Sequence, residues 1–318
     1  MQHKLPIVFS HRYDITMLGI QRLHPFDSEK YGKVFSYLCK EGLIQKGQHH
    51  IPQEVTRTQL LRVHTEKYLQ FLKKSRIVAA IAEVGILRRL PNFLLQWRLL
   101  KPMRLATGGT LLGADLALKH GWAINLSGGY HHAKSNISSG FCFYSDIALA
   151  TYQLRDAHPT MKVMVVDLDA HQGNGFEAIF AGEPNCITFD MYNGQIYPRD
   201  TEAQQYIQYN YPLPNGMADQ AYLKLLRKKL PLALAQEQPD FIIYNAGTDI
   251  LETDPLGALN ISAEGIIARD HFVFSQARAL GIPILMVLSG GYTAESSRII
   301  ARSIAGLFHK KLIGPETG

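Results

Sequence analysis

The sequence predicts an α/β protein: a single three-layer domain with a mostly parallel central sheet and helices on both faces. Short apolar segments typical of buried strands alternate with segments of helical spacing, and the connections between strands are long enough for helices. The 318 residues contain no internal repeat, low-complexity tract or linker-like stretch. We therefore expect residues 1–318 to form one domain.

The N-terminal third is expected to contain one strand and several helices. Leu5–Phe9 has the composition of a strand. Apolar residues at helical spacing follow Asp27 and Ser28, either of which suits an N-cap, and the helix they predict ends near Gly42. Residues 59–74 are also predicted to be helical, whereas the pattern from there to residue 101 is ambiguous.

The least polar long stretch, Ile77–Leu100, bears on whether the chain crosses a membrane. Charged residues and Pro91 interrupt it, which excludes a membrane span. A segment that covers the sheet is favoured over an interfacial helix carrying Trp97. The first residues lack the apolar core of a signal peptide, and three scattered cysteines are typical of reduced thiols. The sequence therefore predicts a cytoplasmic protein, with a nuclear location as the alternative if the source is a eukaryote.

From Ala106 onward the alternation of helix and strand becomes regular. Apolar, β-branched segments predict strands, and longer segments with helical spacing predict helices. A kink or break at Pro231 stays open. The predicted strands are 123–126, 163–168, 185–191, 241–245 and 283–288, and the predicted helices are 106–120, 145–157, 218–236, 262–280 and 294–311.

The composition describes an ordinary globular chain, because 46% of the residues are hydrophobic and 19% are charged. The formal net charge is +6, but the basic residues are scattered, with no cluster longer than Arg227–Lys229. We therefore expect no direct nucleic-acid binding. Oligomeric state is not indicated.

Three ligand-type side chains lie at the end of the predicted strand 163–168. Asp167, Asp169 and His171 are two residues apart, so they point to one side where the strand ends. Two carboxylates and one imidazole suit Zn²⁺ with an open position. The alternative is a salt-bridged strand end that caps the next helix. Burying three such groups is costly unless something binds them, which favours the metal site.

Other predicted strands also end in polar groups, and the carboxyl ends of parallel strands meet at one edge. Residues 127–132 follow one strand, 246–249 another and 289–292 a third. Together with Asp169 and His171, these segments supply three metal ligands, two histidines and a tyrosine. Such a set can hydrolyse an amide. Cys142 is interpreted as a small buried residue rather than a thiol nucleophile. The six groups are Asp169, His171, Asp249, His131, His132 and Tyr292.

The motifs DLDAHQGNG, GGYHHA with a following GFC, YNAGTDILETDPLG and SGGY together resemble the arginase-fold histone deacetylases and their acetylpolyamine and acetoin-utilisation relatives. HPFDSEKYGKV, GWAIN, DMYNGQIYPRD and LIGPE are most similar to class IV, the histone deacetylase 11-like enzymes. The resemblance is collinear from Pro6 to Glu316. It implies Zn²⁺-dependent hydrolysis of acyl-lysine amides on a protein or peptide, with long-chain fatty-acyl groups favoured over acetyl.

The resemblance also implies roles for single residues. Asp169, His171 and Asp249 would bind Zn²⁺, with Fe²⁺ as the alternative metal. His131 and His132 would form the catalytic dyad, with His132 as general base and acid, and Tyr292 would polarise the substrate carbonyl. Asp167 would support His131 and contribute to a K⁺ site made largely of backbone carbonyls. Asn174 stands where many relatives have an aspartate, and an amide should raise the pKa of the histidine it supports less than a carboxylate would.

The implied acyl-lysine tunnel departs from the family pattern in places. Asn136–Gly140 replaces a more glycine-rich loop, and Ser127 and Tyr130 replace the usual glycine and phenylalanine. These side chains could narrow the tunnel or redirect the acyl group, which puts the long-chain preference in doubt. The tunnel residues are Phe141, Gly140, Gly129, Tyr130, Gly290 and Gly291.

Three rival functions stay open. A small-molecule amidohydrolase acting on acetylated polyamines would need a negatively charged rim, which the sequence does not clearly show. A non-catalytic acyl-lysine-binding protein is disfavoured because all the expected catalytic groups are present. A two-metal ureohydrolase would need further acids where Gln172, Asn174 and Leu251 stand.

Overall fold

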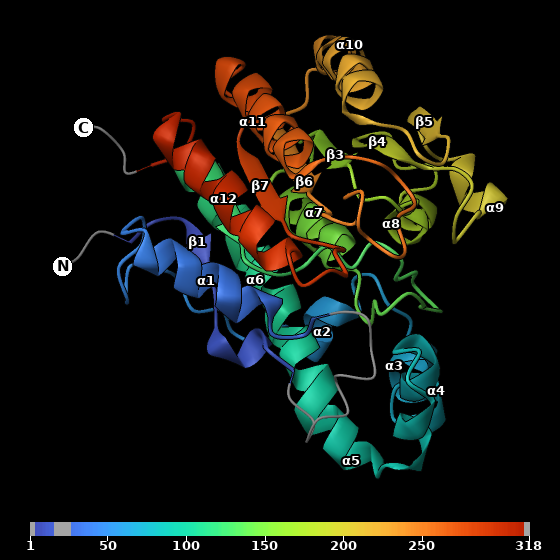
Figure 1. Ribbon diagram of the computed structural model, residues 1–318. Coiled ribbons are helices and arrows are strands. Elements are labelled where there is room, and N and C mark those ends of the chain that lie inside the picture. The colour runs from blue at the N-terminus through green and yellow to red at the C-terminus, as the bar shows by residue number, and fades with distance from the viewer. Residues whose placement is uncertain (1–3, 16–26, 315–318) are drawn as a thin grey trace.

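The computed structural model describes residues 4–15 and 27–314, and these residues form a three-layer α/β fold (Figure 1). A seven-stranded sheet has the order β1-β2-β7-β6-β3-β4-β5, and every recorded pairing is parallel. Helices cover both faces of the sheet, which confirms the predicted fold class. The strands are β1 (Ile7–Val8), β2 (Trp122–Asn125), β3 (Val163–Asp167), β4 (Cys186–Asn193), β5 (Tyr209–Leu213), β6 (Phe241–Asn245) and β7 (Ile284–Val287).

Burial explains which strands were easy to predict. All residues of β3, β6 and β7 are buried, as expected for continuous apolar strands between two helical layers. The edge strand β5 was missed, because it contains Pro212 and is mostly half-exposed, so it lacks the apolar run of a central strand.

Most of the predicted helices are confirmed. The first begins at Lys30 rather than at Asp27 or Ser28, because Asp27 instead accepts the backbone N–H of Glu29 in the turn that precedes it. Pro231 lies within its helix without ending it. The helices are α1 (Lys30–Lys40), α6 (Lys101–His120), α7 (Asp146–Ala157), α8 (Asn174–Ile179), α9 (Thr201–Gln204), α10 (Asp219–Glu237), α11 (Ala263–Ala279) and α12 (Ser296–His309).

The region between α1 and α6 differs most from its prediction. The single helix predicted over 59–74 is wrong: a new helix is capped at Thr65, whose side chain accepts from the backbone N–H of Tyr68. Nor does Ile77–Leu100 cover the sheet, because in Figure 1 α4 and α5 lie beyond it at one end of the molecule, beside α3. The elements here are α2 (Arg57–Leu60), α3 (Glu66–Phe71), α4 (Ser75–Ile81), the 3₁₀ turn η3 (Gly85–Arg89), α5 (Asn92–Leu95) and the π-helical turn η4 (Gln96–Leu100).

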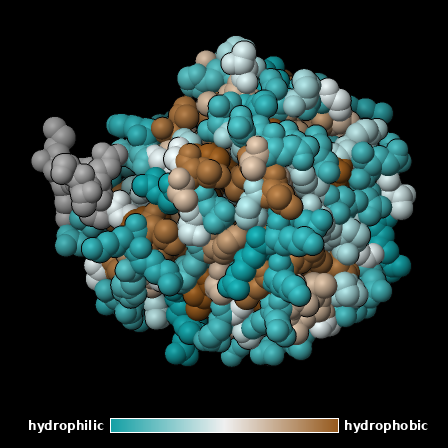
Figure 2. Space-filling model, turned by 90° about the horizontal axis from the view of Figure 1, so that it is seen from above, coloured by the Kyte–Doolittle hydropathy of each residue, from teal (hydrophilic) through white to brown (hydrophobic). Residues whose placement is uncertain are grey.

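Two surface features complete the description. Among the described residues, no helix is long and apolar enough to cross a membrane. The face seen from above is mostly hydrophilic, with small separate hydrophobic patches (Figure 2).

The register of the sheet sets the position of the candidate site. Asp167 pairs with Asn245, Asn245 with Val287, and Val287 with Asn125, so four strands end at one level. The polar segments that follow these strands therefore meet at the carboxyl edge of the sheet, where parallel α/β proteins bind ligands.

Candidate active site

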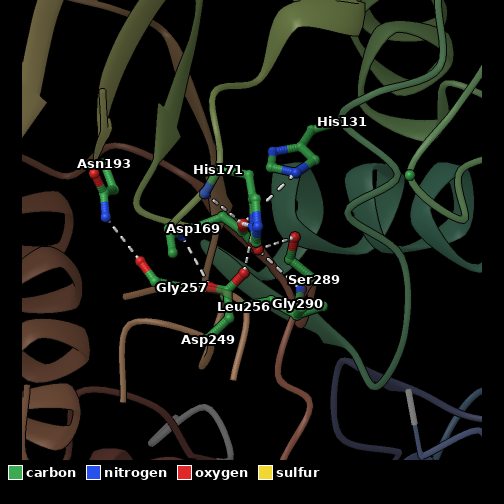
Figure 3. Close-up of polar contacts among 12 residues, drawn as sticks. His131, Asp169, His171, Asn193, Asp249, Leu256, Gly257, Ser289 and Gly290 are labelled. Carbon is green, nitrogen blue, oxygen red and sulfur yellow. Dashed lines mark hydrogen bonds and ion pairs between the residues drawn. The ribbon is translucent and has the colours of Figure 1, made fainter. Parts of the chain in front are cut away.

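Asp169, His171 and Asp249 converge at this edge (Figure 3). Each offers one ligand atom within 4.8 Å of the others, and all three side chains are buried. His171 Nδ1 lies 3.2 Å from Asp169 Oδ1 and 2.8 Å from Asp249 Oδ2. β3 ends at Asp167, so Asp169 and His171 lie in the following loop rather than on the strand.

This donor set fits a divalent cation. Burial, followed by the charge of Asp169, raises the pKa of Asp249 to about 7. The positive charge near these two carboxylates is therefore too small to keep both of them readily ionised. Burial would lower the pKa of His171, but its hydrogen bonds with Asp169 and Asp249 raise it to about 10. A metal ion that takes the place of this shared proton would satisfy all three groups.

Ser289 and Gly290 hold the carboxylate of Asp169 in place. Asp169 Oδ2 accepts from Ser289 Oγ at 2.8 Å and from the backbone N–H of Gly290 at 2.9 Å. A Cβ on Gly290 would lie 2.5 Å from Asp249 Oδ2 and 2.7 Å from Asp169 Oδ2, so only glycine fits here. Sequence reasoning missed Ser289 because an isolated serine beside two glycines carries no chemical signal.

A buried cation, Lys30, contacts the backbone of Ser289 and Gly290. Lys30 Nζ donates to the backbone carbonyls of Ser289, at 2.6 Å, and Gly290, at 3.1 Å. Burial lowers its pKa to about 8, although nearby carboxylates including Asp249 and Asp169 oppose the shift. Lys30 was not predicted as a site residue, because its motif HPFDSEKYGKV was used only to indicate the class within the family.

The paired histidines lie side by side, with ring centroids 4.1 Å apart, but their environments differ. His131 Nδ1 is 2.9 Å from Asp167 Oδ2, and His132 Nδ1 is 2.9 Å from Asn174 Oδ1. Burial would lower the pKa of His131, but the charges of Asp167 and Asp169 raise it to about 9. Burial and the neighbouring histidines hold the pKa of His132 well below its usual value. Two imidazoles with opposite shifts are typical of an acid–base site.

Asn174 is itself held by a charged pair that the sequence did not reveal. Its Nδ2 donates to Asp200 Oδ2 at 2.9 Å, and Lys134 Nζ lies 2.6 Å from the same oxygen. Partial burial would raise the pKa of Asp200, but these hydrogen bonds hold it at about 2. Asp200 is therefore ionised, and Asn174 lies between its charge and His132.

Aromatic side chains surround the metal-ligand group. The ring of Tyr292 lies 6.3 Å from His171 and 6.0 Å from Phe141, centroid to centroid. Burial and the charges of Asp249 and Asp169 raise the pKa of Tyr292 well above its usual value, so the phenol keeps its proton. Tyr197, which was not predicted, lies 5.1 Å from the ring of His132, and its hydroxyl bonds Ser139 Oγ at 2.5 Å.

A cavity of about 950 Å³, including its open mouth, adjoins these groups. Gly129, Tyr130, Gly140, Phe141 and Gly290 line it, whereas Gly291 does not. The lining also includes His131, His132 and Tyr292, together with the apolar side chains of Leu87, Leu99 and Met103.

Gly291 and Phe141 show how backbone geometry shapes this edge. A Cβ on Gly291 would meet Thr248 Oγ1, so this glycine packs behind the cavity. Phe141 has φ of +64°, which is rare for a bulky residue, and its backbone N–H donates to the carbonyl of Ile81 at 3.0 Å. Helix α4 thereby holds the aromatic wall of the cavity.

Residues 24–307 match the family model described as the histone deacetylase domain. The chain is 44% identical to histone deacetylase 2 of Arabidopsis thaliana, over 98% of this chain and 80% of that protein. The HD domain of HDA15 superposes with a TM-score of 0.78 at 21% identity, over 98% of this chain and 90% of that one. An acetylpolyamine aminohydrolase from Burkholderia pseudomallei superposes with a TM-score of 0.76 at 22% identity, over 95% and 98%. The two structural likenesses show a shared fold.

Proposed function

This chain belongs to the histone deacetylase domain family, and on that premise we propose that it is a Zn²⁺-dependent hydrolase that removes acyl groups from lysine side chains of proteins. The observation that carries the proposal is the buried group of Asp169, His171 and Asp249 beside an apolar cavity. Carboxylate and imidazole ligands that leave a position open are typical of catalytic zinc.

The chain's own residues can perform the proton transfers of amide hydrolysis. Zn²⁺ held by the three ligands would supply a Lewis acid for the amide carbonyl and for the attacking water. His132 is neutral because its pKa is low, so its Nε2 accepts a proton from the water and passes it to the leaving lysine nitrogen. Tyr292, which keeps its proton, donates a hydrogen bond to the oxygen that becomes negative.

His131 has a different part, because Asp167 keeps it positively charged. A charged imidazole beside the reacting carbonyl stabilises the negative charge that develops there. We also propose that Asp167 contributes to a K⁺ site formed with nearby backbone carbonyls.

A long-chain fatty-acyl group is the substrate class we propose for the cavity. The lining of the cavity is mostly apolar, and each buried methylene of a longer acyl chain contributes about 0.8 kcal/mol. The altered loop does not oppose this substrate, since Ile137 is 62% exposed and is not among the residues that line the cavity. Asn174, which replaces the aspartate of many relatives, supports the class IV assignment within the family.

The experiment that tests this function measures hydrolysis of one lysine peptide carrying acetyl, octanoyl or myristoyl, with acetylputrescine alongside. The proposal expects the greatest kcat/KM with the long acyl chains. Preference for the acetyl peptide would contradict the proposed length of the acyl chain, but the proposed deacylase activity would stand. Turnover of acetylputrescine alone would instead assign the chain to small-molecule amide hydrolysis, and no turnover with metal bound would favour an acyl-lysine-binding protein.

A further inference from the structure

Positive charge is concentrated in one part of the fold, residues 54–104, which we call the basic lobe. This lobe contains eleven lysines and arginines and three glutamates, a net charge of +8, whereas the whole chain carries +6. The rest of the protein is therefore slightly acidic. The basic residues are spread along the sequence, but the fold brings α3, α4 and α5 together at one end of the molecule (Figure 1).

The acids of the basic lobe do not neutralise its outer surface. Arg88, Arg89 and Arg98 are exposed, and none of them forms an ion pair within residues 4–15 and 27–314. Two of the three glutamates are already engaged elsewhere in the lobe: Glu54 pairs with Lys101 and Arg104, and Glu66 with Arg57. The lobe therefore presents uncompensated cations to any docking surface.

Two large apolar side chains lie among these cations. Phe93 is 74% exposed and Trp97 is 56% exposed, although both belong to residue types that usually pack inside. They are four residues apart on α5 and η4, so they lie on one face, and both line the same surface hollow. The guanidinium of Arg98 lies 4.0 Å from the ring centroid of Trp97.

We propose that the basic lobe docks onto an anionic membrane surface. Exposed aromatic side chains flanked by arginines match the interface of a bilayer, where rings insert at headgroup depth and cations face acidic lipids. The charge asymmetry identifies this occupant, because an anionic surface attracts the lobe and repels the acidic remainder of the chain. Docking does not depend on the proposed catalytic activity.

The position of the lobe gives this docking a consequence for the site. Leu87 and Leu99 belong to the lobe and also line the cavity of the candidate active site. A docked molecule therefore holds that cavity close to the bilayer. Fatty-acylated lysines partition to the same interface, so docking would raise the local concentration of the proposed substrate.

Vesicle co-sedimentation tests the proposal with the full chain. Vesicles of phosphatidylcholine alone are compared with vesicles that also contain phosphatidylserine, at ionic strengths from about 0.01 to 1 M. We expect binding only to the anionic vesicles, weakening as salt rises. The exposed Trp97 gives a second readout, because the other tryptophan, Trp122, is 2% exposed. Insertion should shift the emission of Trp97 to shorter wavelength.

Two matched variants keep the test specific. Phe93→Ala with Arg88→Glu and Arg89→Glu should lower the vesicle partition coefficient at least tenfold, since the variant loses one inserting ring and replaces two cations near acidic lipids with anions. Leu232→Ala with Arg227→Glu and Lys228→Glu, a matched change on the exposed face of α10, should bind as the native chain does. All changed positions are exposed, and thermal unfolding checks that both variants fold.

Several outcomes would overturn the proposal. It fails if the native chain does not bind anionic vesicles at low salt, or if both variants lose binding equally. It also fails if Phe93→Ala instead abolishes self-association in the absence of lipid, because the patch would then be an interface between copies of this chain. None of these outcomes bears on the acyl-lysine activity, which is measured on soluble peptides.

Discussion

Asn174 donates a hydrogen bond from Nδ2 to Asp200 Oδ2, 2.9 Å away, and this bond decides how the amide faces the histidine pair. With its nitrogen committed to Asp200, only Oδ1 of Asn174 can face His132 Nδ1, 2.9 Å away. Nδ1 must therefore carry the hydrogen, which leaves the lone pair of His132 on Nε2. A proton acceptor at Nε2 is what the proposed hydrolysis requires.

Replacing Asp200 tests this arrangement. Asp200 also caps α9, so we compare two residues that both cap helices well. Asp200→Asn still reaches Asn174 and should keep most of the activity. Asp200→Ser is too short to reach it and should lower kcat by about tenfold or more, with KM little changed. Equal kcat in the two variants would show that Asp200 only caps the helix.

Gly290→Ala should weaken metal binding. The added Cβ would lie 2.5 Å from Asp249 Oδ2 and 2.7 Å from Asp169 Oδ2, which forces the ligand oxygens apart. We expect at least a tenfold loss of Zn²⁺ affinity in competition with a chelator. Gly85→Ala is the control, because a Cβ there meets nothing within 4 Å. Unchanged affinity in Gly290→Ala would mean that these carboxylates do not hold the metal.

Leu99→Trp should separate long acyl chains from short ones. Leu99 is one of the apolar residues that line the cavity, so a larger side chain there takes up space that a myristoyl group needs. The kcat/KM for a myristoyl peptide should fall at least tenfold, while that for an acetyl peptide changes little. Leu61→Trp, at an exposed position of the same lobe, serves as the control. A parallel loss for both peptides would count against a chain-length role.

His64 should make stability depend on pH. It is buried, and its Nε2 accepts from the backbone N–H of Ser145 at 3.0 Å, which suits a neutral ring. Burial lowers its pKa from 6.5 to about 4. The unfolded chain therefore binds more protons between these values, so stability is full above pH 6.5 and is lost as pH falls toward 4.

The expected loss is on the order of 3 kcal/mol in the free energy of unfolding. Urea unfolding at several pH values, compared between the native chain and His64→Gln, measures it. The glutamine variant should lack the part of this pH dependence that comes from protonation of His64. Identical slopes in the two proteins would show that His64 does not titrate as described.

The sequence predicted the parts of the site that follow buried strands. Asp169, His171 and Asp249 could be assigned because apolar strands are recognisable and their carboxyl ends meet at one edge. The part of the cavity lining that comes from Leu87 and Leu99 and the basic lobe could not be predicted, because the short helices between α2 and α6 are set by local caps such as Thr65 rather than by long apolar periodicity.

The supporting residues were missed for a different reason. Asp200 and Lys30 act through contacts with residues far away in the chain, and the motifs that contain them indicate a family but not these contacts. Tyr197 is half-exposed on a loop, where tyrosine is common, so its contact with His132 emerges only from the fold.

The most direct test of the central claim is metal dependence of turnover. The native chain and Asp249→Ala are stripped with a chelator, and hydrolysis of a myristoyl-lysine peptide is followed as Zn²⁺ is restored. The account predicts no activity in the stripped native protein, recovery with about one Zn²⁺ per chain, and no recovery in Asp249→Ala. Full activity after stripping, or equal recovery in Asp249→Ala, would contradict the assignment of Asp169, His171 and Asp249 as the catalytic metal centre.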